Sequence, residues 1–305
     1  MLKLISWNIQ CARTLSGAAD LNRVADRLMA CFADGAVDIV LLQEIGCRVP
    51  GRDGGILGDQ FAGLAARLPG YRGIHALAQE QPDGDGPARG IGCMTFSRHP
   101  IVQVRRHALP RPFDADTEAD RRSMPRAVLD TTVATPAGPL RVLNAHLEYF
   151  SLRQRLAQVE YLRGLGLEAA ERSAGNGRHR RDGAEQDTDG RAADGWAAGA
   201  PRNGADIILA GDLNLLPGSE CHRRLLAPGA GATAPWQDAW TLVHPHGSRT
   251  AHAPTVGLHD PSPGAQPFTF DYFCVSPGLG ARVRAVRVDP GAGVSDHQPL
   301  LIELD

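Results

Sequence analysis

The sequence lacks several features that would place it in a familiar class of protein. No apolar run approaches the ~20 residues that a membrane-spanning helix requires. The stretch MLKLISWNIQ has a lone lysine and an apolar segment interrupted by asparagine, so the parts of a secretory signal are missing. The six cysteines are scattered without a CxxC pair or a Cys/His cluster, which argues against structural zinc and a disulfide framework. We therefore expect a soluble, cytoplasmic protein with reduced thiols.

An excess of charge and the common nucleotide-binding motifs are also missing. The net charge is -2, so no global basic field indicates nucleic-acid binding, although a local basic groove remains possible. No phosphate-cradling P-loop and no GxGxxG sequence follows a predicted strand, so nucleotide-driven transfer and dinucleotide redox chemistry are poorly supported. Hydrophobic residues make up 43% and charged residues 22% of the 305 residues, as is typical of globular proteins.

What the chain does contain is a regular succession of strand and helix patterns. Strands are predicted from alternating or continuous apolar runs and helices from apolar residues at helical spacing. The predicted strands are 2–9, 37–44, several between 71 and 110, the hairpin 127–135 and 138–148, 205–214, and at least three near the C-terminus; the predicted helices are 20–32, 58–68 and 151–170. The strand-rich halves on either side of the helix at 151–170 predict two packed sheets with helices outside.

Residues 172–204 differ in composition from the rest of the chain. Gly, Ala, Arg and Asp dominate there and aliphatic residues are almost absent, so the segment cannot bury enough apolar area to order itself. We expect a single domain over 1–305 with a disordered surface insertion at 172–204.

Polar and acidic side chains end several predicted strands where a core strand would stay apolar. Each one alone has an ordinary explanation as a turn, a helix cap or a satisfied polar residue. Together they form an acid- and amide-rich set of the type that holds Mg²⁺ or Mn²⁺, whose shell is commonly completed by water and phosphate oxygens. The set predicts metal-assisted phosphoryl chemistry and consists of Asn8, Glu44, Asn144, His146, Asp212, Asn214, Asp271, Asp296 and His297.

The motifs that carry these residues are SWNIQ, LLQE, LNAHLE, GDLN, FDYFCVSPGL and SDHQPL. In order and approximate spacing they resemble the endonuclease/exonuclease/phosphatase superfamily over about residues 2–304. This superfamily contains metal-dependent phosphoesterases such as exonuclease III, DNase I, neutral sphingomyelinases and inositol polyphosphate 5-phosphatases. The resemblance implies a DNase I-like α/β fold, a four-layer α/β/β/α sandwich of two mixed sheets with outer helices, and hydrolysis of phosphate esters.

The resemblance also implies a metal and a water-activating group. Glu44 matches the principal metal ligand, with Asn8 beside it and Asp296 as a further contributor. Asp212 matches the residue that activates or positions the attacking water, which makes it the candidate base. Asn214 is then the neighbour that orients water or phosphate, and the expected ion is Mg²⁺ or Mn²⁺.

The phosphoryl group is expected to meet a second set of side chains. His297 resembles the histidine that contacts the phosphoryl oxygens, and Asp271 resembles the carboxylate that fixes this imidazole. His146 is expected to help stabilise the developing charge. Arg126 opens a strand and is either a phosphate ligand or a surface cation, and Asn144 is either a site contact or a strand-end hydrogen-bonding residue.

The motifs leave the substrate class open. His146 within LNAHLE resembles the sphingomyelinase-like and phosphatase-like branches more than the DNA-repair branch, and Tyr149 is interpreted as a packing or rim residue. The leading prediction is a phosphodiesterase for a small diester, a phospholipid headgroup or a nucleic acid, without an obligate protein partner. A DNA endonuclease or exonuclease and a non-catalytic binding relative are the alternatives.

A loop rich in Pro and Gly precedes the predicted strand that contains FDYF. Four histidines of this region are irregularly spaced, so they are predicted to be solvated loop residues: His244, His246, His252 and His259. Trp236 and Trp240 stand four residues apart and are predicted to belong to the core rather than to a base-stacking platform.

Overall fold

The computed structural model describes residues 1–13, 19–31, 37–51, 55–82, 84, 88–181, 206–229, 234–244 and 252–305. The strands of these segments form two six-stranded sheets. In the order in which they pair, the first sheet contains β11 (Val283–Val288), β12 (Leu300–Leu304), β1 (Leu2–Asn8), β2 (Ile39–Cys47), β4 (Arg89–Ser97) and β3 (Arg72–Gln81). The second contains β5 (Ile101–Ala108), β6 (Ala127–Thr135), β7 (Gly138–His146), β8 (Ile207–Asp212), β10 (Asp271–Val275) and β9 (Gln237–Asp238).

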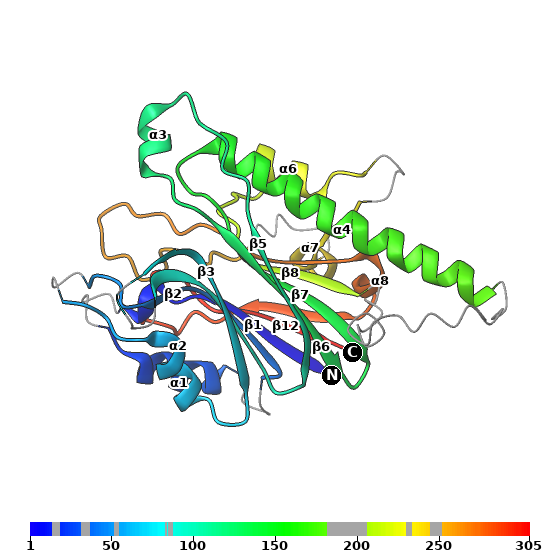
Figure 1. Ribbon diagram of the computed structural model, residues 1–305, viewed down its shortest axis with the longest axis horizontal. Helices are drawn as coiled ribbons and strands as arrows, with labels where there is room; N and C mark the ends of the chain where they lie inside the picture. The colour runs from blue at the N-terminus through cyan, green and yellow to red at the C-terminus, as the bar shows by residue number, and fades with distance from the viewer. Residues whose placement is uncertain are drawn as a thin grey trace.

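Helices lie on the outer side of each sheet, as Figure 1 shows. The first sheet carries α1 (Leu21–Ala30) and α2 (Gln60–Arg67), and the second carries α4 (Leu152–Arg181) and α6 (Glu220–Leu226). The shorter helices are η1 (Gln10–Ala12), α3 (Thr117–Arg122), α7 (Ala239–Val243) and α8 (Pro277–Gly280). The predicted four-layer α/β/β/α sandwich of mixed sheets is therefore confirmed.

Three main apolar clusters correspond to the three interfaces between the layers. The first cluster lies between the two sheets, where side chains such as Leu41 of β2 and Ile208 of β8 are fully buried. Outside the first sheet, Trp7 packs in the cluster that includes Phe61 of α2, and outside the second, Leu209 packs in the cluster that includes Val159 of α4. Since consecutive residues of a strand point to opposite faces, both faces of these strands are apolar and buried.

Parallel strand pairs determine where the functional residues meet. β1 and β2 run parallel, with Asn8 paired to Gln43, and β7 and β8 run parallel, with His146 paired to Asp212. The carboxyl ends of both pairs lie at the same edge of the sandwich, and β10 begins there with Asp271 opposite Asp212. The polar strand ends that the sequence singled out are thereby gathered at one edge.

Helix α4 extends further than the sequence predicts. The apolar pattern predicts its end near residue 170, whereas the helix continues to Arg181 and so enters the predicted insertion. Continuing a formed helix adds one hydrogen bond for each residue, so extension past the predicted end costs little free energy. The rest of the predicted insertion, 182–204, lies outside the described residues.

The remaining expectations about cysteines and membranes are simpler. All six cysteines are free and buried, as expected of reduced core thiols. Within the ranges given above, no helix combines the length and the apolarity needed to cross a bilayer.

Candidate active site

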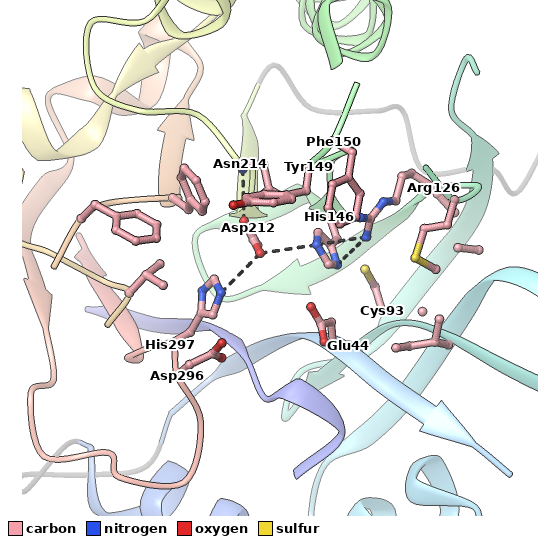
Figure 2. A pocket seen from close by; sticks show the side chains of 18 residues that line it. Glu44, Cys93, Arg126, His146, Tyr149, Phe150, Asp212, Asn214, Asp296 and His297 are labelled. Carbon is pink, nitrogen blue, oxygen red and sulfur yellow. Dashed lines mark hydrogen bonds and ion pairs between the residues drawn. The ribbon is translucent and has the colours of Figure 1, made fainter. Parts of the chain in front are cut away.

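A cleft of about 400 Å³ opens at the edge where the parallel strand pairs end. Figure 2 shows carboxylates, imidazoles and one guanidinium pointing into it from both sheets. Seven of the predicted functional residues line this cleft: Glu44, Arg126, His146, Asp212, Asn214, Asp296 and His297. Asn8 and Asp271 lie directly behind these side chains and hydrogen-bond to them.

Glu44 reaches the cleft because β2 is irregular at this point. The register between β2 and β4 shifts between Leu42 and Ile45, and Glu44 within this irregularity has a φ of 49°. A bulge re-aims the side chain that it contains, and left-handed backbone at a residue other than glycine costs about 1–3 kcal/mol. Asn214, another lining residue, also has a positive φ, of 52°. Two of the predicted site residues therefore have strained backbone.

Asp212 follows a glycine whose backbone conformation excludes a side chain. The preceding residue, Gly211, has a φ of 141°, and a Cβ at this position would lie 1.8 Å from the carbonyl oxygen of Ala145. A residue with a side chain cannot occupy this position without moving the backbone. The parallel pairing of β7 with β8 places Asp212 beside His146, whose Nε2 lies 3.4 Å from Asp212 Oδ2.

Asn8 joins the carboxylates of the two sheets. Its Nδ2 donates to Glu44 Oε1 at 3.1 Å and to Asp212 Oδ2 at 3.0 Å, and its Oδ1 accepts the backbone N–H of Gln10 at 3.0 Å. The side chain is fully buried. Asn8 thus holds the two acids in a fixed relation from behind the cleft.

His297 connects Asp212 to the buried Asp271. Its Nδ1 lies 2.9 Å from Asp271 Oδ2, and its Nε2 lies 3.6 Å from Asp212 Oδ2. Burial lowers the pKa of His297, but the carboxylates of Asp271 and Asp212 outweigh it and raise the pKa to about 10. Burial raises the pKa of Asp212 to about 7, with Asp271 and Glu44 acting in the same direction. The protonated imidazole of His297 therefore lies beside the carboxyl group of Asp212, whose pKa is raised by burial and by the neighbouring carboxylates.

The Ser-Asp-His segment lies in the loop before β12 and is tied to β1. Ser295 Oγ donates to the carbonyl oxygen of Asn8 at 2.8 Å, and Trp7 Nε1 donates to the carbonyl oxygen of His297 at 3.0 Å. Asp296 Oδ2 accepts a hydrogen bond from Gln10 Nε2 at 2.9 Å. Asp296 and His297 are thereby directed into the cleft from neighbouring positions with different partners.

Arg126 and His146 form the opposite side of the cleft. The guanidinium Nη1 lies 3.1 Å from Nδ1 and 3.0 Å from Nε2 of His146. Burial, the Arg126 charge and His297 all lower the pKa of His146 well below its usual value, so the ring is neutral. Arg126 is 8% exposed and lines the cleft, which excludes the surface-cation interpretation.

A divalent cation fits this donor set. Glu44, His146 and Asp212 each offer a ligand atom, and these atoms lie within 4.8 Å of one another. Two carboxylates and a neutral imidazole suit a divalent ion, and its charge would offset the mutual repulsion of the carboxylates. His146 takes a place in this set that the sequence did not assign to it, while Asp296 lies on the same cleft without belonging to the set.

Asn144 is not placed to contact a substrate. It is fully buried, and its Nδ2 donates to the carbonyl oxygens of Leu42 and Met94 at 3.2 and 3.0 Å. Its Oδ1 accepts from Gln43 Nε2 at 2.8 Å. Of the two interpretations left open by the sequence, the structure shows the hydrogen-bonding one, because Asn144 ties the two sheets together.

Sequence reasoning missed two further components of the site. Glu148 is fully buried behind the cleft and accepts hydrogen bonds from Phe150 N, Met124 N and Arg126 Nε at 2.8, 3.2 and 3.4 Å. The sequence signal for Glu148 was its position at the end of the LNAHLE motif. The second component is a group of three phenylalanines that line the cleft beside Tyr149, the residue that the sequence interpreted as a packing or rim residue: Phe150, Phe268 and Phe270.

A second cluster of ligand-type side chains joins α6, the start of α7 and the chain segment before β10. Asp238 Oδ2 lies 2.6 Å from His252 Nε2 and 3.3 Å from His222 Nε2. The N–H of Gly218 donates to His222 Nδ1, so a neutral His222 carries its proton on Nε2, where a metal would have to bind. This cluster therefore consists of hydrogen bonds that join His222 and His252 to Asp238, and we call it the Asp238 tie. Burial raises the pKa of Asp238, but the two hydrogen bonds outweigh this effect and lower the pKa.

The prediction for the loop histidines is accordingly wrong for His252. Its side chain is 10% exposed and bonded to Asp238, because the Pro/Gly-rich chain folds back over β10. His244 is also partly buried, with Nε2 3.1 Å from the carbonyl oxygen of Val286, while His246 lies outside the described residues. His259 is exposed, with a hydrogen bond to Pro290, and Trp236 is a core residue as predicted.

Two mixed six-stranded sheets with outer helices define a DNase I-like α/β sandwich. The model of the Endonuclease/Exonuclease/phosphatase family matches residues 5–297, so the chain belongs to this family and is a phosphoric ester hydrolase. No curated protein matches the sequence significantly.

Solved structures share the fold at low sequence identity. An endonuclease/exonuclease/phosphatase from Bacteroides vulgatus has a TM-score of 0.63 and 17% identity, with 100% of this chain and 99% of that chain covered. One from Beutenbergia cavernae has a TM-score of 0.61 and 20% identity, covering 99% and 70%. The mannosyl-6-phosphatase Bt3783 from Bacteroides thetaiotaomicron has a TM-score of 0.60 and 16% identity, covering 100% of each chain.

Proposed function

We propose that this protein is a Mg²⁺- or Mn²⁺-dependent phosphodiesterase whose active site is the cleft around Asp212. The observation that carries the proposal is the convergence of Glu44, Asn8 and Asp212 with the His297–Asp271 pair at one strand edge. Acids that can hold a divalent ion thereby face imidazoles that can contact phosphoryl oxygens, which is the arrangement that hydrolysis of a phosphate ester requires.

The residues of the chain divide the work by position. Asp212 is directed into the cleft and positions the attacking water as its base, and Asn214 is held beside it by donating to the carbonyl oxygen of Leu147 at 2.9 Å. His297 is oriented by Asp271 and donates from Nε2 toward the non-bridging oxygens. Arg126 adds a fixed positive charge on the opposite side. A divalent ion held by Glu44, His146 and Asp212 would supply further stabilisation of charge on the phosphoryl oxygens.

The cleft offers few fixed positive side chains to a doubly charged phosphate. Arg126 is the one guanidinium or ammonium among the described lining residues, and it lies with the protonated imidazole of His297 among three carboxylates, from Glu44, Asp212 and Asp296. A diester carries one negative charge and a monoester approaches two near neutral pH, so a monoester would rely more on the charge of a divalent ion. A nuclease would need several phosphate contacts along a strand, which this lining does not supply.

Hydrolysis of two chromogenic esters tests the proposal directly. We expect metal-dependent release of p-nitrophenolate from bis-p-nitrophenyl phosphate to exceed that from p-nitrophenyl phosphate, and to stop with EDTA. Glu44→Gln and Asp212→Asn should each lower kcat by about 10²–10⁴-fold. Glu118→Gln, on the exposed α3, is the matched control and should retain full activity.

The opposite outcomes are equally informative. Faster cleavage of the monoester would replace the diesterase with a phosphatase, the activity named for the Bacteroides thetaiotaomicron neighbour. Absence of turnover of both esters with Mg²⁺ and Mn²⁺ would revive a binding-only relative.

A further inference from the structure

Four aromatic side chains form a continuous surface on one side of the cleft, and we call this surface the aromatic wall: Tyr149, Phe150, Phe268 and Phe270. The ring centroids of Tyr149 and Phe150 lie 5.0 Å apart at an interplanar angle of 86°. Tyr149 and Phe270 lie 6.0 Å apart at 70°, and Phe268 and Phe270 lie 4.6 Å apart at 68°. Edge-to-face contacts of this type connect the loop after β7 to the loop before β10.

The side chains of the aromatic wall keep much of their area exposed. Tyr149 is 51% exposed, and Phe150 and Phe268 are each 37% exposed. Large apolar side chains usually avoid such exposure, and a contiguous group of them next to polar side chains is typical of a ligand-binding surface.

Backbone hydrogen bonds hold the aromatic wall in place. Phe150 N donates to the buried Glu148, and Arg155 Nη1 donates to the carbonyl oxygen of Tyr149 at 2.7 Å. On the other loop, Phe268 and Val256 exchange two backbone hydrogen bonds of 3.1 and 2.9 Å. Because the backbone that carries the rings is already fixed, a ligand that contacts them loses less free energy to ordering the protein.

The aromatic wall lies on a different side of the cleft from two of its carboxylates, those of Glu44 and Asp296. In Figure 2, Tyr149 and Phe150 lie on the side of His146 and Arg126, whereas Glu44 and Asp296 lie across the cleft. A phosphoryl group bound in the cleft in front of Asp212 and His297 would place one of its ester groups near the rings.

The size and charge of the cleft restrict what that ester group can be. About 400 Å³ matches a small molecule rather than a long chain, and the single guanidinium among the described lining residues does not form a track for a polynucleotide. The faces and edges of the protein's aromatic rings are complementary to another planar ring. Contacts between aromatic rings add binding free energy beyond that of burying the same apolar area.

We propose that the aromatic wall binds a planar ring on one ester group of the substrate, so the natural substrate is a small phosphodiester of an aryl or nucleoside alcohol. This inference rests on the proposed phosphodiesterase function and names its substrate class. Aryl and nucleoside esters share the recognised chemistry, a flat ring close to a single phosphate.

Binding of product analogues measures the contribution of the ring without requiring turnover. Isothermal titration calorimetry with Mn²⁺ would compare methylphosphonate, phenylphosphonate, dodecylphosphonate and thymidine 5′-monophosphate. Stacking on an aromatic side chain is commonly worth about 1–3 kcal/mol, so we expect phenylphosphonate to bind about 5- to 150-fold more tightly than methylphosphonate. Thymidine 5′-monophosphate binding more tightly than phenylphosphonate would identify the nucleoside source, and the reverse order the aryl source.

Variants of the exposed rings assign the effect to the aromatic wall. Tyr149→Ala and Phe268→Ala should each remove much of the preference for the ring and leave the affinity for methylphosphonate unchanged. Tyr149→Leu keeps apolar area without a ring and should also reduce the preference. Phe113→Ala is the control, since Phe113 is 69% exposed and lies outside the cleft lining.

Three results would overturn the inference. Equal affinities for phenylphosphonate and methylphosphonate would show that the rings do not contact the ester group, while hydrolysis of bis-p-nitrophenyl phosphate would leave the phosphodiesterase intact. Dodecylphosphonate binding as tightly as phenylphosphonate, unchanged in Tyr149→Leu, would indicate selection of apolar bulk. Failure of every phosphonate to bind, together with absent hydrolysis of bis-p-nitrophenyl phosphate, would reject the phosphodiesterase as well.

Discussion

Replacing Glu148 with glutamine would test whether one buried carboxylate organises the side of the cleft that carries Arg126. Its Oε1 accepts from Phe150 N at 2.8 Å, while its Oε2 accepts from Met124 N at 3.2 Å and Arg126 Nε at 3.4 Å. The side chain is fully buried, so water does not replace a hydrogen bond that is lost. Glutamine has the same shape but only one oxygen and no charge.

The expected destabilisation follows from this geometry. If the glutamine oxygen takes the place of Oε2, its amide group faces Phe150 N, and two donors oppose each other. An unsatisfied buried donor costs about 1–3 kcal/mol, and Arg126 also loses its charged partner. We therefore expect Glu148→Gln to lower the free energy of unfolding by about 2–4 kcal/mol.

Urea denaturation combined with steady-state kinetics separates the effects on stability and on binding. Under conditions where the variant remains folded, KM for bis-p-nitrophenyl phosphate should rise more than kcat falls, because Arg126 and Phe150 lose their anchor while Asp212 keeps its partners. Glu118→Gln, on an exposed pair with Arg121, should change the unfolding free energy by less than about 0.5 kcal/mol. A Glu148→Gln variant within 0.5 kcal/mol of the wild type, with unchanged KM, would refute the role of Glu148.

Two further predictions concern packing and acid stability. Gly211→Ala should lower the free energy of unfolding by at least about 2 kcal/mol, because its Cβ would meet Ala145 at 1.8 Å. Gly138→Ala has a similarly positive φ but no atom within 4 Å, so thermal unfolding of the pair isolates the clash, and equal losses would contradict it. Burial raises the pKa of Asp130, but His107 and Arg141 outweigh it and lower the pKa. Asp130→Asn should therefore cost about 3 kcal/mol above pH 3.8, a cost that disappears as pH falls through the lower folded-state pKa; urea titrations showing a cost independent of pH would disprove this.

The gathering of polar strand ends was predictable from the sequence because parallel strands bring their carboxyl ends together. Asn8, His146 and Asp212 occupy final positions of their strands, and each is followed by a change in the apolar pattern. Strand periodicity also placed Asn144 and His146 on one face. It did not reveal their depth, and Asn144 proved to lie between the sheets, bonded to main-chain carbonyl groups.

The aromatic wall and the Asp238 tie were not predictable by the same reasoning. Tyr149 and Phe270 are far apart in the sequence, and neither belongs to a periodic pattern that would predict a shared surface. His252 lies in a stretch whose Pro and Gly content indicates a loop, and composition alone does not show that the loop folds back onto the second sheet. In both cases the contact depends on tertiary packing of loops, for which local sequence carries no period.

Precise placement of the acids requires directional contacts between the two sheets. The apolar layer between them stabilises their association, but apolar contacts are not directional and tolerate small sliding movements. Asn8 bonds Glu44 within the first sheet and Asp212 of the second sheet, so sliding of the sheets would break the bond to Asp212. Behind it, Gln43 and Asn144 form a second polar connection between the two sheets, at 2.8 Å. Since unmade hydrogen bonds in a buried layer are costly, these two ties fix the distance between acids that belong to separate sheets.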